Sequence, residues 1–457
     1  MERRFAERKE AMLAECEVLP QVFAGVAQRL AQFVEPFAEL LRQPAQREHA
    51  TDYVRGVLSD LERKNVESIA YRCDQDRRDL QHFIGCATWD HRPLLTELAR
   101  QVGEELGEDD GVIVFDPSAF PKKGTKSVGV QRQWCGRLGK VDNCQVAVSM
   151  AYVSRIDHAL VNARLYLPQE WAQDRARRQA AGVPKDVRFQ TRHAQALEML
   201  AECGAALPHA WIAGDDEMGK SGGFRWDLHA LGERYLLAVP CDTLIRDLDA
   251  PAPEYRGRGA VPKRPFERVD RWRDALGAAD WARINVRDGD KGPLEVDVAT
   301  CRVRTKSKGR IMKHDETLVV VRSRGDDGAT KYDFYLSNAP RGTTAKEFAR
   351  VALAAPRIEE AIKRGKSEAG LAHYEVRHWL GWHHHQTLSL IAAWFLMREA
   401  LRGKKMDSRD DRAADPRWHR QALARAMSRR YANAHRRQRH TPIASQRTGQ
   451  VLSLQST

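Results

Sequence analysis

The sequence predicts an α/β fold in which a helical region precedes a mixed core and a β-rich segment interrupts that core. Three observations carry this prediction. Apolar residues recur at three- and four-residue steps up to about residue 105. Short β-branched runs begin at Gly111 and alternate with helical segments up to about residue 240. Further strand-like runs then fill residues 241–335 before helical spacing returns.

Residues 1–105 are expected to form an all-helical N-terminal domain. Between Val22 and Phe37 the apolar residues recur at the helical period, which places them on one face of a helix. Similar spacing continues around Tyr53 and Leu98. Glycine is scarce in this region, as an uninterrupted helical pattern requires.

Residues 106–240 are expected to form the first part of the core. Strand-like runs fall at residues 111–116, 144–153, 159–167, 210–215 and 235–239, and helical segments fall at 169–181, 190–205 and from about 221. The first and the fourth of these strands each end in an aspartate. A strand ending in an acid, two further strands, helices and a strand ending in a second acid is the element order of an RNase H-like fold. The sequence therefore predicts an RNase H-like core.

Beyond residue 240 the pattern changes twice. Residues 241–335 open with a stretch rich in proline, glycine and arginine and continue with strand-like runs, which predicts a β-rich insertion. Helices at 344–370 and 380–401 then supply the second part of the core, residues 336–400. The last segment, residues 401–457, holds 14 Lys/Arg and 4 Asp/Glu, a local net charge of +10. Such a tail is solvated when free and can still bind phosphate in a salt-dependent way.

The whole chain of 457 residues carries a net charge of +13, which indicates a polyanionic partner. Nucleic acid and an anionic membrane surface both fit this charge, but the basic tail lacks the apolar face that a membrane surface requires. The sequence has no run of 18 apolar residues and no signal-peptide pattern, so we expect neither a transmembrane helix nor secretion. Its eight cysteines are scattered without a CxxC pair, which favours reduced thiols in a cytoplasmic protein over a zinc site.

Two aspartates follow predicted strands. Asp116 ends the first strand, and an acid there faces the crevice where α/β sheets keep their active sites. Three lysines on the next loop suit a metal–phosphate site, whereas an aspartate that starts a turn is the structural alternative. Asp215 begins the cluster Asp215-Asp216-Glu217, for which a helix N-cap is the structural alternative. The sequence leaves open which acid of this cluster points inward.

A third acidic position lies in a predicted helix, at Glu359 and Glu360. Lys363 and Lys366 follow Glu359 by four and seven residues, on the same helix face. An exposed helix with ion pairs is the structural alternative. Three convergent carboxylates would repel one another unless a cation lay among them. Oxygen ligands select Mg²⁺ or Mn²⁺, and two such ions clamp the attacking and leaving oxygens of a phosphoryl transfer.

A run of three histidines, His383-His384-His385, follows Trp379 and adjoins Trp382. Adjacent histidines on a helix point in different directions, and neither a cysteine nor a carboxylate completes a ligand set in this segment. We therefore expect the histidines to pack or to contact nucleic acid rather than to bind a metal.

Between residues 50 and 400 the chain resembles the DDE transposases of bacterial insertion sequences, in the branch with a Tyr-Arg-Glu-Lys helix signature. The motifs that carry the resemblance are DPSAFPKKGTKSVGV from Asp116, RQWCG from Arg132, GKVDNCQ from Gly139, and Ile358-Glu359 with Lys366 after six intervening residues. Met218-Gly219 stands where the family has a tyrosine–glycine element after its second aspartate, which matches that aspartate to Asp215 and leaves Asp216 as the alternative.

The resemblance implies a metal-dependent nuclease and strand transferase that cleaves the ends of its insertion sequence and joins them to target DNA. It assigns Asp116, Asp215 and Glu359 to two Mg²⁺ (or Mn²⁺) ions, and Lys366 to a nearby phosphate. The residues expected along the DNA are Lys122, Lys123, Lys126, Arg132 and Lys363. The N-terminal helices would recognise the element ends, and the protein would work as a homodimer on double-stranded DNA, associated with the bacterial nucleoid.

Two other functions stay open at this stage. The first is a transposase-derived DNA-binding protein without catalysis, which is supported by Ala352, Ala355 and Pro356 at positions where the family has tyrosine, arginine and tryptophan. The second is an RNase H-like nuclease that cuts DNA without joining strands. Metal-dependent cleavage separates the first function from a transposase, and strand-transfer products separate the second.

Overall fold

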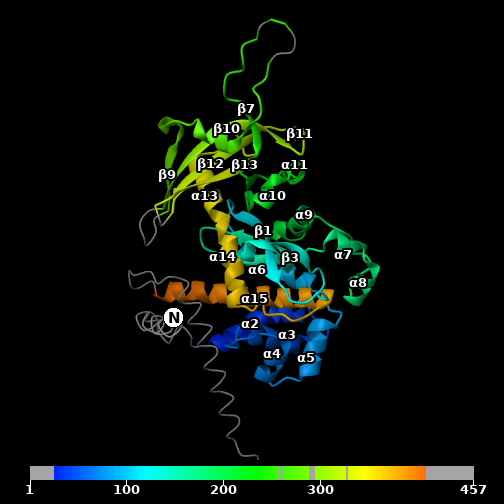
Figure 1. Ribbon diagram of the computed structural model, residues 1–457. Helices are drawn as coiled ribbons and strands as arrows, with labels where there is room; N and C mark the ends of the chain where they lie inside the picture. The colour runs from blue at the N-terminus through cyan, green and yellow to red at the C-terminus, as the bar shows by residue number, and fades with distance from the viewer. Residues whose placement is uncertain (1–24, 256, 259–261, 288–293, 326–327, 408–457) are drawn as a thin grey trace, which may run out of the picture.

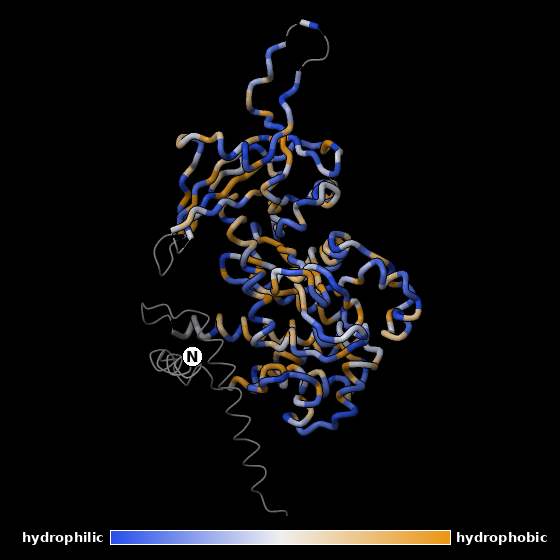
Figure 2. Tube along the Cα trace, in the orientation of Figure 1, coloured by the Kyte–Doolittle hydropathy of each residue, from blue (hydrophilic) through white to orange (hydrophobic). Residues whose placement is uncertain are grey.

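Thirteen strands in the described part of the chain form one continuous mixed sheet, with helices packed against it and below it (Figure 1). The computed structural model describes residues 25–255, 257–258, 262–287, 294–325 and 328–407. Figure 2 shows that the strands are mainly hydrophobic, whereas the outer loops are mainly hydrophilic. Apolar burial therefore follows the sheet, as an α/β fold requires.

Every regular element described before residue 107 is a helix, in line with the sequence pattern. The helices are α2 (Val26–Glu39), α3 (Pro44–Val57), α4 (Val66–Cys73), α5 (Arg77–Gly85) and α6 (Arg92–Leu106). Helix α4 begins where the Asn65 side chain accepts a hydrogen bond from the Ser68 amide at 2.9 Å. The expected helical residues before Gly25 lie outside the described residues.

The long helix α15 (Trp379–Asp407) lies between the sheet and the helices α2 to α5, whereas α6 packs on β4 itself (Figure 1). It is longer than the predicted helix 380–401 and includes the first residues of the predicted basic tail. Residues 408–457, the remainder of that tail, lie outside the described residues.

The strands that position the acids are at one end of the sheet, in the order β4-β3-β1-β5-β6. They are β1 (Val112–Pro121), β3 (Lys140–Val153), β4 (His158–Leu165), β5 (Trp211–Gly214) and β6 (Tyr235–Ala238). Strand β3 runs antiparallel to β1 and β4, whereas β5 runs parallel to β1 and β6. A short edge strand, β2 (Gln131–Cys135), pairs antiparallel with β3. The predicted strand order along the chain is confirmed for these elements.

Strand β1 does not end at Asp116, as the sequence predicted, but continues to Pro121. What ends at this point is the parallel pairing with β5, whose last pair is Phe115 with Gly214. Beyond it β1 still pairs with β3, so Asp116 lies opposite Ser149. Residues 117–121 remain in the strand because β3 continues to pair with them.

Short helices connect β4 to β5 and β5 to β6. They are α7 (Gln169–Gln173), α8 (Arg175–Ala180), α9 (Arg192–Cys203), α10 (Asp216–Lys220) and α11 (Gly222–Ala230). Side-chain caps begin four of them: Asp174 accepts from the Arg177 amide, Thr191 from the Ala194 amide, Asp215 from the Met218 amide and Ser221 from the Phe224 amide.

The β-rich segment predicted for residues 241–335 extends the same sheet. Its elements are β7 (Leu244–Asp247), β8 (Glu267–Arg268), α12 (Val269–Asp274), β9 (Ala282–Arg287), β10 (Leu294–Ser307), β11 (Arg310–Ile311), β12 (Glu316–Arg324) and β13 (Thr330–Ser337). Strand β13 pairs antiparallel with β6, with Leu336 opposite Leu237. The segment also has a smaller hydrophobic cluster of its own, which includes Ile245, Val303 and Leu318.

The predicted helical stretch 344–370 is two helices, α13 (Ala345–Ala354) and α14 (Pro356–Ser367). The break falls before Pro356, which occupies the first turn of α14, where its missing amide hydrogen costs nothing. Helix α13 contacts β9 and β10, and α14 contacts β1, β3 and β4 (Figure 1). Helix α14 therefore carries its side chains to the strands that hold the first two acids.

Candidate active site

Asp116 and Asp215 occupy equivalent positions on two neighbouring parallel strands. The last parallel pair of β1 and β5 is Phe115 with Gly214; Asp116 is the next residue of β1, and Asp215 directly follows the end of β5. Both side chains line one cleft. Their convergence follows from register, because residues that follow a matched pair of parallel strands emerge side by side.

The chain after Asp215 turns at once into α10. The Asp215 carboxylate caps this helix, accepting a hydrogen bond from the Met218 amide at 3.1 Å. Helix α10 packs closely on β6, since a Cβ atom at Gly219 would lie 1.8 Å from the carbonyl oxygen of Ala238. The N-cap alternative for Asp215 is therefore correct, and the same side chain also faces the cleft.

Burial and neighbouring carboxylates destabilise the ionised forms of both aspartates. Burial, followed by the charges of Glu359 and Glu217, raises the pKa of Asp116 to about 6, although Lys366 opposes the rise. Burial, followed by the charge of Asp116, raises the pKa of Asp215 to about 8, although the Met218 amide opposes it. Both shifts mean that the ionised carboxylates are poorly compensated by the protein alone.

Glu359 reaches the same cleft from the first turn of α14. The residues of α14 that line the cleft are Glu359, Ile362, Lys363, Lys366 and Ser367, which lie on one helix face. Within the described residues the Glu359 carboxylate forms neither an ion pair nor a side-chain hydrogen bond. Its neighbour Glu360 instead pairs with Arg364 and lies 3.5 Å from Arg357. Of the two glutamates, Glu359 is the one available to a ligand in the cleft.

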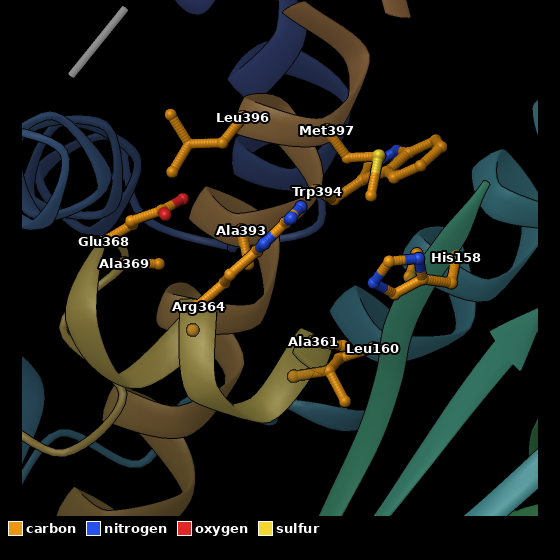
Figure 3. Close-up of a pocket in the computed structure, with 12 residues that line it drawn as sticks. His158, Leu160, Ala361, Arg364, Glu368, Ala369, Ala393, Trp394, Leu396 and Met397 are labelled. Carbon is orange, nitrogen blue, oxygen red and sulfur yellow. The ribbon is translucent and has the colours of Figure 1, made fainter. Parts of the chain in front are cut away.

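The opposite face of α14 lines a second, much smaller cavity against β4 and α15 (Figure 3). Figure 3 shows Arg364 extending from α14 toward Trp394 of α15, with His158 beside them. This cavity has a volume of about 30 Å³, whereas the cleft that holds the acids has a volume of about 860 Å³. Of these two spaces, only the cleft is large enough for a nucleic-acid segment, and it also holds the three acids, so we place the functional site there.

Lys366 sits close to the first acid. Its ammonium donates to the Ser118 hydroxyl at 3.2 Å and to the Ala119 carbonyl at 3.3 Å, and lies 4.4 Å from the centre of the Phe120 ring. Burial and the charge of Arg137 lower the pKa of Lys366 to about 8, while Asp116 opposes the fall. The side chain is therefore held on β1 at the edge of the cleft.

The remaining basic residues expected along DNA occupy different environments. Lys363 is exposed and lines the cleft. Lys123, Lys126 and Arg132 are exposed but are not among the residues that line it. Lys122 is half-buried: its ammonium donates to the Tyr374 carbonyl at 3.2 Å and lies 3.5 Å from the centre of that ring. Its position favours a structural role over a contact with DNA.

Several cleft residues were not singled out by the sequence patterns. They are Trp134, Arg137, Arg192 and His373, together with Glu217 of the acidic cluster. Arg192 pairs with Glu217 at 2.5 Å and donates to Gln133 at 3.3 Å. No local motif marks Arg192, because it is brought to the cleft only when α9 packs on the sheet.

No three His, Cys, Asp or Glu side chains form a ready-made metal-ligand group in the described part of the chain. The histidine run packs against other side chains, which is one of the two roles expected for it. The rings of His384 and Trp89 stack with their centroids 3.7 Å apart, and His385 Nδ1 hydrogen-bonds with the Tyr53 hydroxyl at 2.8 Å. The cysteines of the described residues are free thiols.

We expect Asp215→Asn to raise the free energy of unfolding by about 1–3 kcal/mol at pH 8 without divalent cations. The folded-state pKa of Asp215, about 8, lies above its unfolded value, so wild-type stability falls as pH rises from about 4 to 8. Asparagine retains the N-cap acceptor and removes the charge. Urea unfolding in EDTA at pH 4 and pH 8 tests this, with the exposed Asp216→Asn as control. Equal stability of Asp215→Asn and wild type at pH 8 would contradict the charge repulsion.

Comparison with known proteins identifies the family of the chain. The sequence model of the family described as DDE superfamily endonuclease matches residues 36–293, more than half of the chain, and includes Asp116 and Asp215. A probable transposase for insertion sequence element IS701 from Microchaete diplosiphon is 35% identical over 96 residues, which cover 21% of this chain and 25% of that relative. The chain thus matches only about a quarter of that relative's length.

Among solved structures, a piggyBac transposase synaptic complex with hairpin DNA aligns over 93% of this chain and 82% of its own, at a TM-score of 0.38 and 10% sequence identity. This likeness is remote. The family match rests on the sequence, and it covers both strands that carry the aspartates. The chain belongs to the DDE superfamily endonucleases, and the resemblance to insertion-sequence transposases is confirmed.

Proposed function

We propose that this protein is a DNA transposase that cleaves the ends of an insertion sequence and joins them to target DNA. The observation that carries the proposal is the convergence of Asp116, Asp215 and Glu359, from two strands and a helix, on one cleft flanked by lysines. The strand order β4-β3-β1-β5-β6, antiparallel on one side of β1 and parallel on the other, supports an RNase H-like core for the site.

Divalent cations fit the donors of this cleft. Asp116, Asp215 and Glu359 offer only oxygen, which suits Mg²⁺ or Mn²⁺, and the raised pKa values of both aspartates mark charge that a cation would compensate. Glu359 is exposed and unpaired within the described residues, so it can turn toward such an ion. Two bound ions would neutralise charge on the phosphate and activate water for hydrolysis.

The chain's own residues would bind and orient the DNA. Lys366 and Lys363 line the cleft from α14, and Arg137 lines it from the turn between β2 and β3. These cations would hold phosphates on either side of the cleaved bond. The ion pair of Arg192 with Glu217 would hold α9 against the start of α10, next to Asp215.

The proposed substrate is double-stranded DNA, first at the element ends and then at the target, with the protein acting as a homodimer. The N-terminal helices up to Leu106 and the basic tail would supply end recognition and non-specific affinity. None of the described helices is both long and apolar enough to cross a lipid bilayer.

We expect Lys366→Met to slow metal-dependent DNA cleavage by about ten- to hundredfold while the fold is retained. The ammonium is held by Ser118 and Ala119 beside Asp116, where it can meet a phosphate oxygen. Because its pKa is lowered to about 8, the wild-type rate should also fall as pH rises above 8. Single-turnover rates at pH 7 to 9 test both expectations, with the exposed Lys346→Met on α13 as control. If Lys366→Met cleaves DNA at the wild-type rate, Lys366 has no role in cleavage.

The function is tested by incubating the purified protein and Mg²⁺ with DNA that carries the ends of the flanking element. We expect cleavage at the ends and joining of the freed 3′-hydroxyl to a target plasmid. Cleavage without joined products would identify a nuclease instead. Binding without cleavage would identify a DNA-binding protein that has lost catalysis.

A further inference from the structure

The β2–β3 hairpin forms one wall of the cleft and carries an exposed tryptophan. Strand β2 leads through a short 3-10 helix, Gly136–Leu138, into β3. Trp134 and Arg137 of this hairpin line the same cleft as Asp116 and Asp215. The Trp134 side chain is 61% exposed. Within the described residues its indole makes neither a hydrogen bond nor a ring contact.

The exposure of Trp134 follows from strand alternation. Cys135 of β2 and Cys144 of β3 point into a small buried cluster, so Trp134 must point outward. Its partner across the pair is Val141, which is 51% exposed, and Leu138 at the turn is 44% exposed. The hairpin therefore presents a small apolar surface beside the cleft, defined by Trp134, Leu138 and Val141.

Cations surround this apolar surface on the cleft side. Arg132 and Arg137 are exposed on the same hairpin, and Lys363 faces the cleft from α14. Arg137 at the tip of the hairpin lines the same cleft as Lys363 and Lys366 of α14. An exposed indole close to cations suits a ligand that has both negative charge and a planar ring. A nucleotide strand with an unstacked base has both, since its phosphates bind cations and its base stacks on an aromatic ring.

We propose that Trp134 stacks on an unpaired DNA base next to the phosphate held in the cleft. This inference rests on the proposed function and deepens it, because it names the feature of the DNA that the cleft recognises: a base displaced from the duplex. Stacking on the exposed indole would stabilise the displaced base and hold the adjacent backbone against the acids. A base inside the duplex offers no free face to the same indole, because it is stacked between its neighbours.

Fluorescence anisotropy in EDTA tests the proposal with two labelled oligonucleotides: a blunt duplex, and the same duplex with a single-stranded overhang. We expect Trp134→Ala to weaken binding of the overhang DNA about five- to hundredfold and to leave blunt-duplex affinity within about twofold. Trp134→Phe should retain most of the overhang affinity. Trp226→Ala serves as the control, since Trp226 is also exposed but lies on α11 and is not among the residues that line the cleft.

Equal affinity of wild type and Trp134→Ala for the overhang DNA would overturn the proposal, as would an equal loss on both DNAs. A change of oligomeric state in Trp134→Ala by light scattering, with overhang affinity intact, would overturn it in favour of a protein interface. Because no cleavage is measured, the result is independent of the proposed function. If the wild type cleaves DNA but Trp134→Ala keeps its affinity for the overhang DNA, only this inference is wrong. If Trp134→Ala loses that affinity but the wild type does not cleave DNA, only the proposed function is wrong.

Discussion

Asp116→Asn, Asp215→Asn and Glu359→Gln are each expected to slow Mg²⁺-dependent DNA cleavage by on the order of a thousandfold while leaving DNA affinity within about twofold. Each substitution keeps the shape of the side chain and removes one negative oxygen donor from the cleft. Because the three acids act as one unit, the double variant Asp116→Asn/Asp215→Asn should be little slower than either single variant.

Glu360→Gln is the matched control for Glu359→Gln. It changes the adjacent glutamate, whose carboxylate pairs with Arg364 and Arg357 rather than facing the cleft. Its cleavage rate should stay within about twofold of wild type. A loss in Glu360→Gln with full activity in Glu359→Gln would mean that α14 presents the other glutamate to the DNA. Full activity in either aspartate variant would exclude that aspartate from the site.

The second large effect concerns stability. Arg225 of α11 and Glu316 of β12 form an ion pair at 2.7 Å, with side chains 2% and 0% exposed. Tyr235 donates its hydroxyl to Glu316 at 2.7 Å, and Arg225 also donates to Thr305 and to the Gly219 carbonyl. This network joins α11, β6, β10 and β12 just behind the helix that Asp215 caps.

Glu316→Ala should lower the free energy of unfolding by about 3–5 kcal/mol, because it leaves the Arg225 charge buried and unpaired. The control is Glu295→Gln, which breaks an exposed pair with Arg283 and should cost less than about 1 kcal/mol. The double variant Arg225→Met/Glu316→Leu should recover part of the loss, since it removes both charges. Urea unfolding measures all three. A loss below about 1 kcal/mol in Glu316→Ala would show that the pair does not hold these elements together.

Much of the fold could be predicted from the sequence, because burial on both faces leaves strands such as β1 and β5 as continuous apolar runs. The predicted end of β1 at Asp116 was wrong, because pairing with β3 continues where pairing with β5 stops. The helical stretch predicted for residues 344–370 is divided into two helices, and Pro356 carried the signal for the break.

The candidate site could be predicted only in part. Asp116 and Asp215 stood out because each follows an apolar run, but their adjacency depends on the register of β1 with β5, which no local pattern encodes. Arg192 and Trp134 were missed for the same reason, since each reaches the cleft through long-range packing. Lys122 was expected to face DNA, but Tyr374, distant in sequence, covers it.

The central claim is that Asp116, Asp215 and Glu359 together hold divalent cations. The most direct test replaces Mg²⁺ with Fe²⁺ and adds ascorbate and peroxide, so that hydroxyl radicals cut the polypeptide next to the bound metal. Mass spectrometry of the fragments should place the cuts near residues 116, 215 and 359, and excess Mg²⁺ or the Asp116→Asn/Asp215→Asn substitutions should suppress them. Cuts confined to other parts of the chain, or cuts at these acids that Mg²⁺ does not suppress, would contradict the claim.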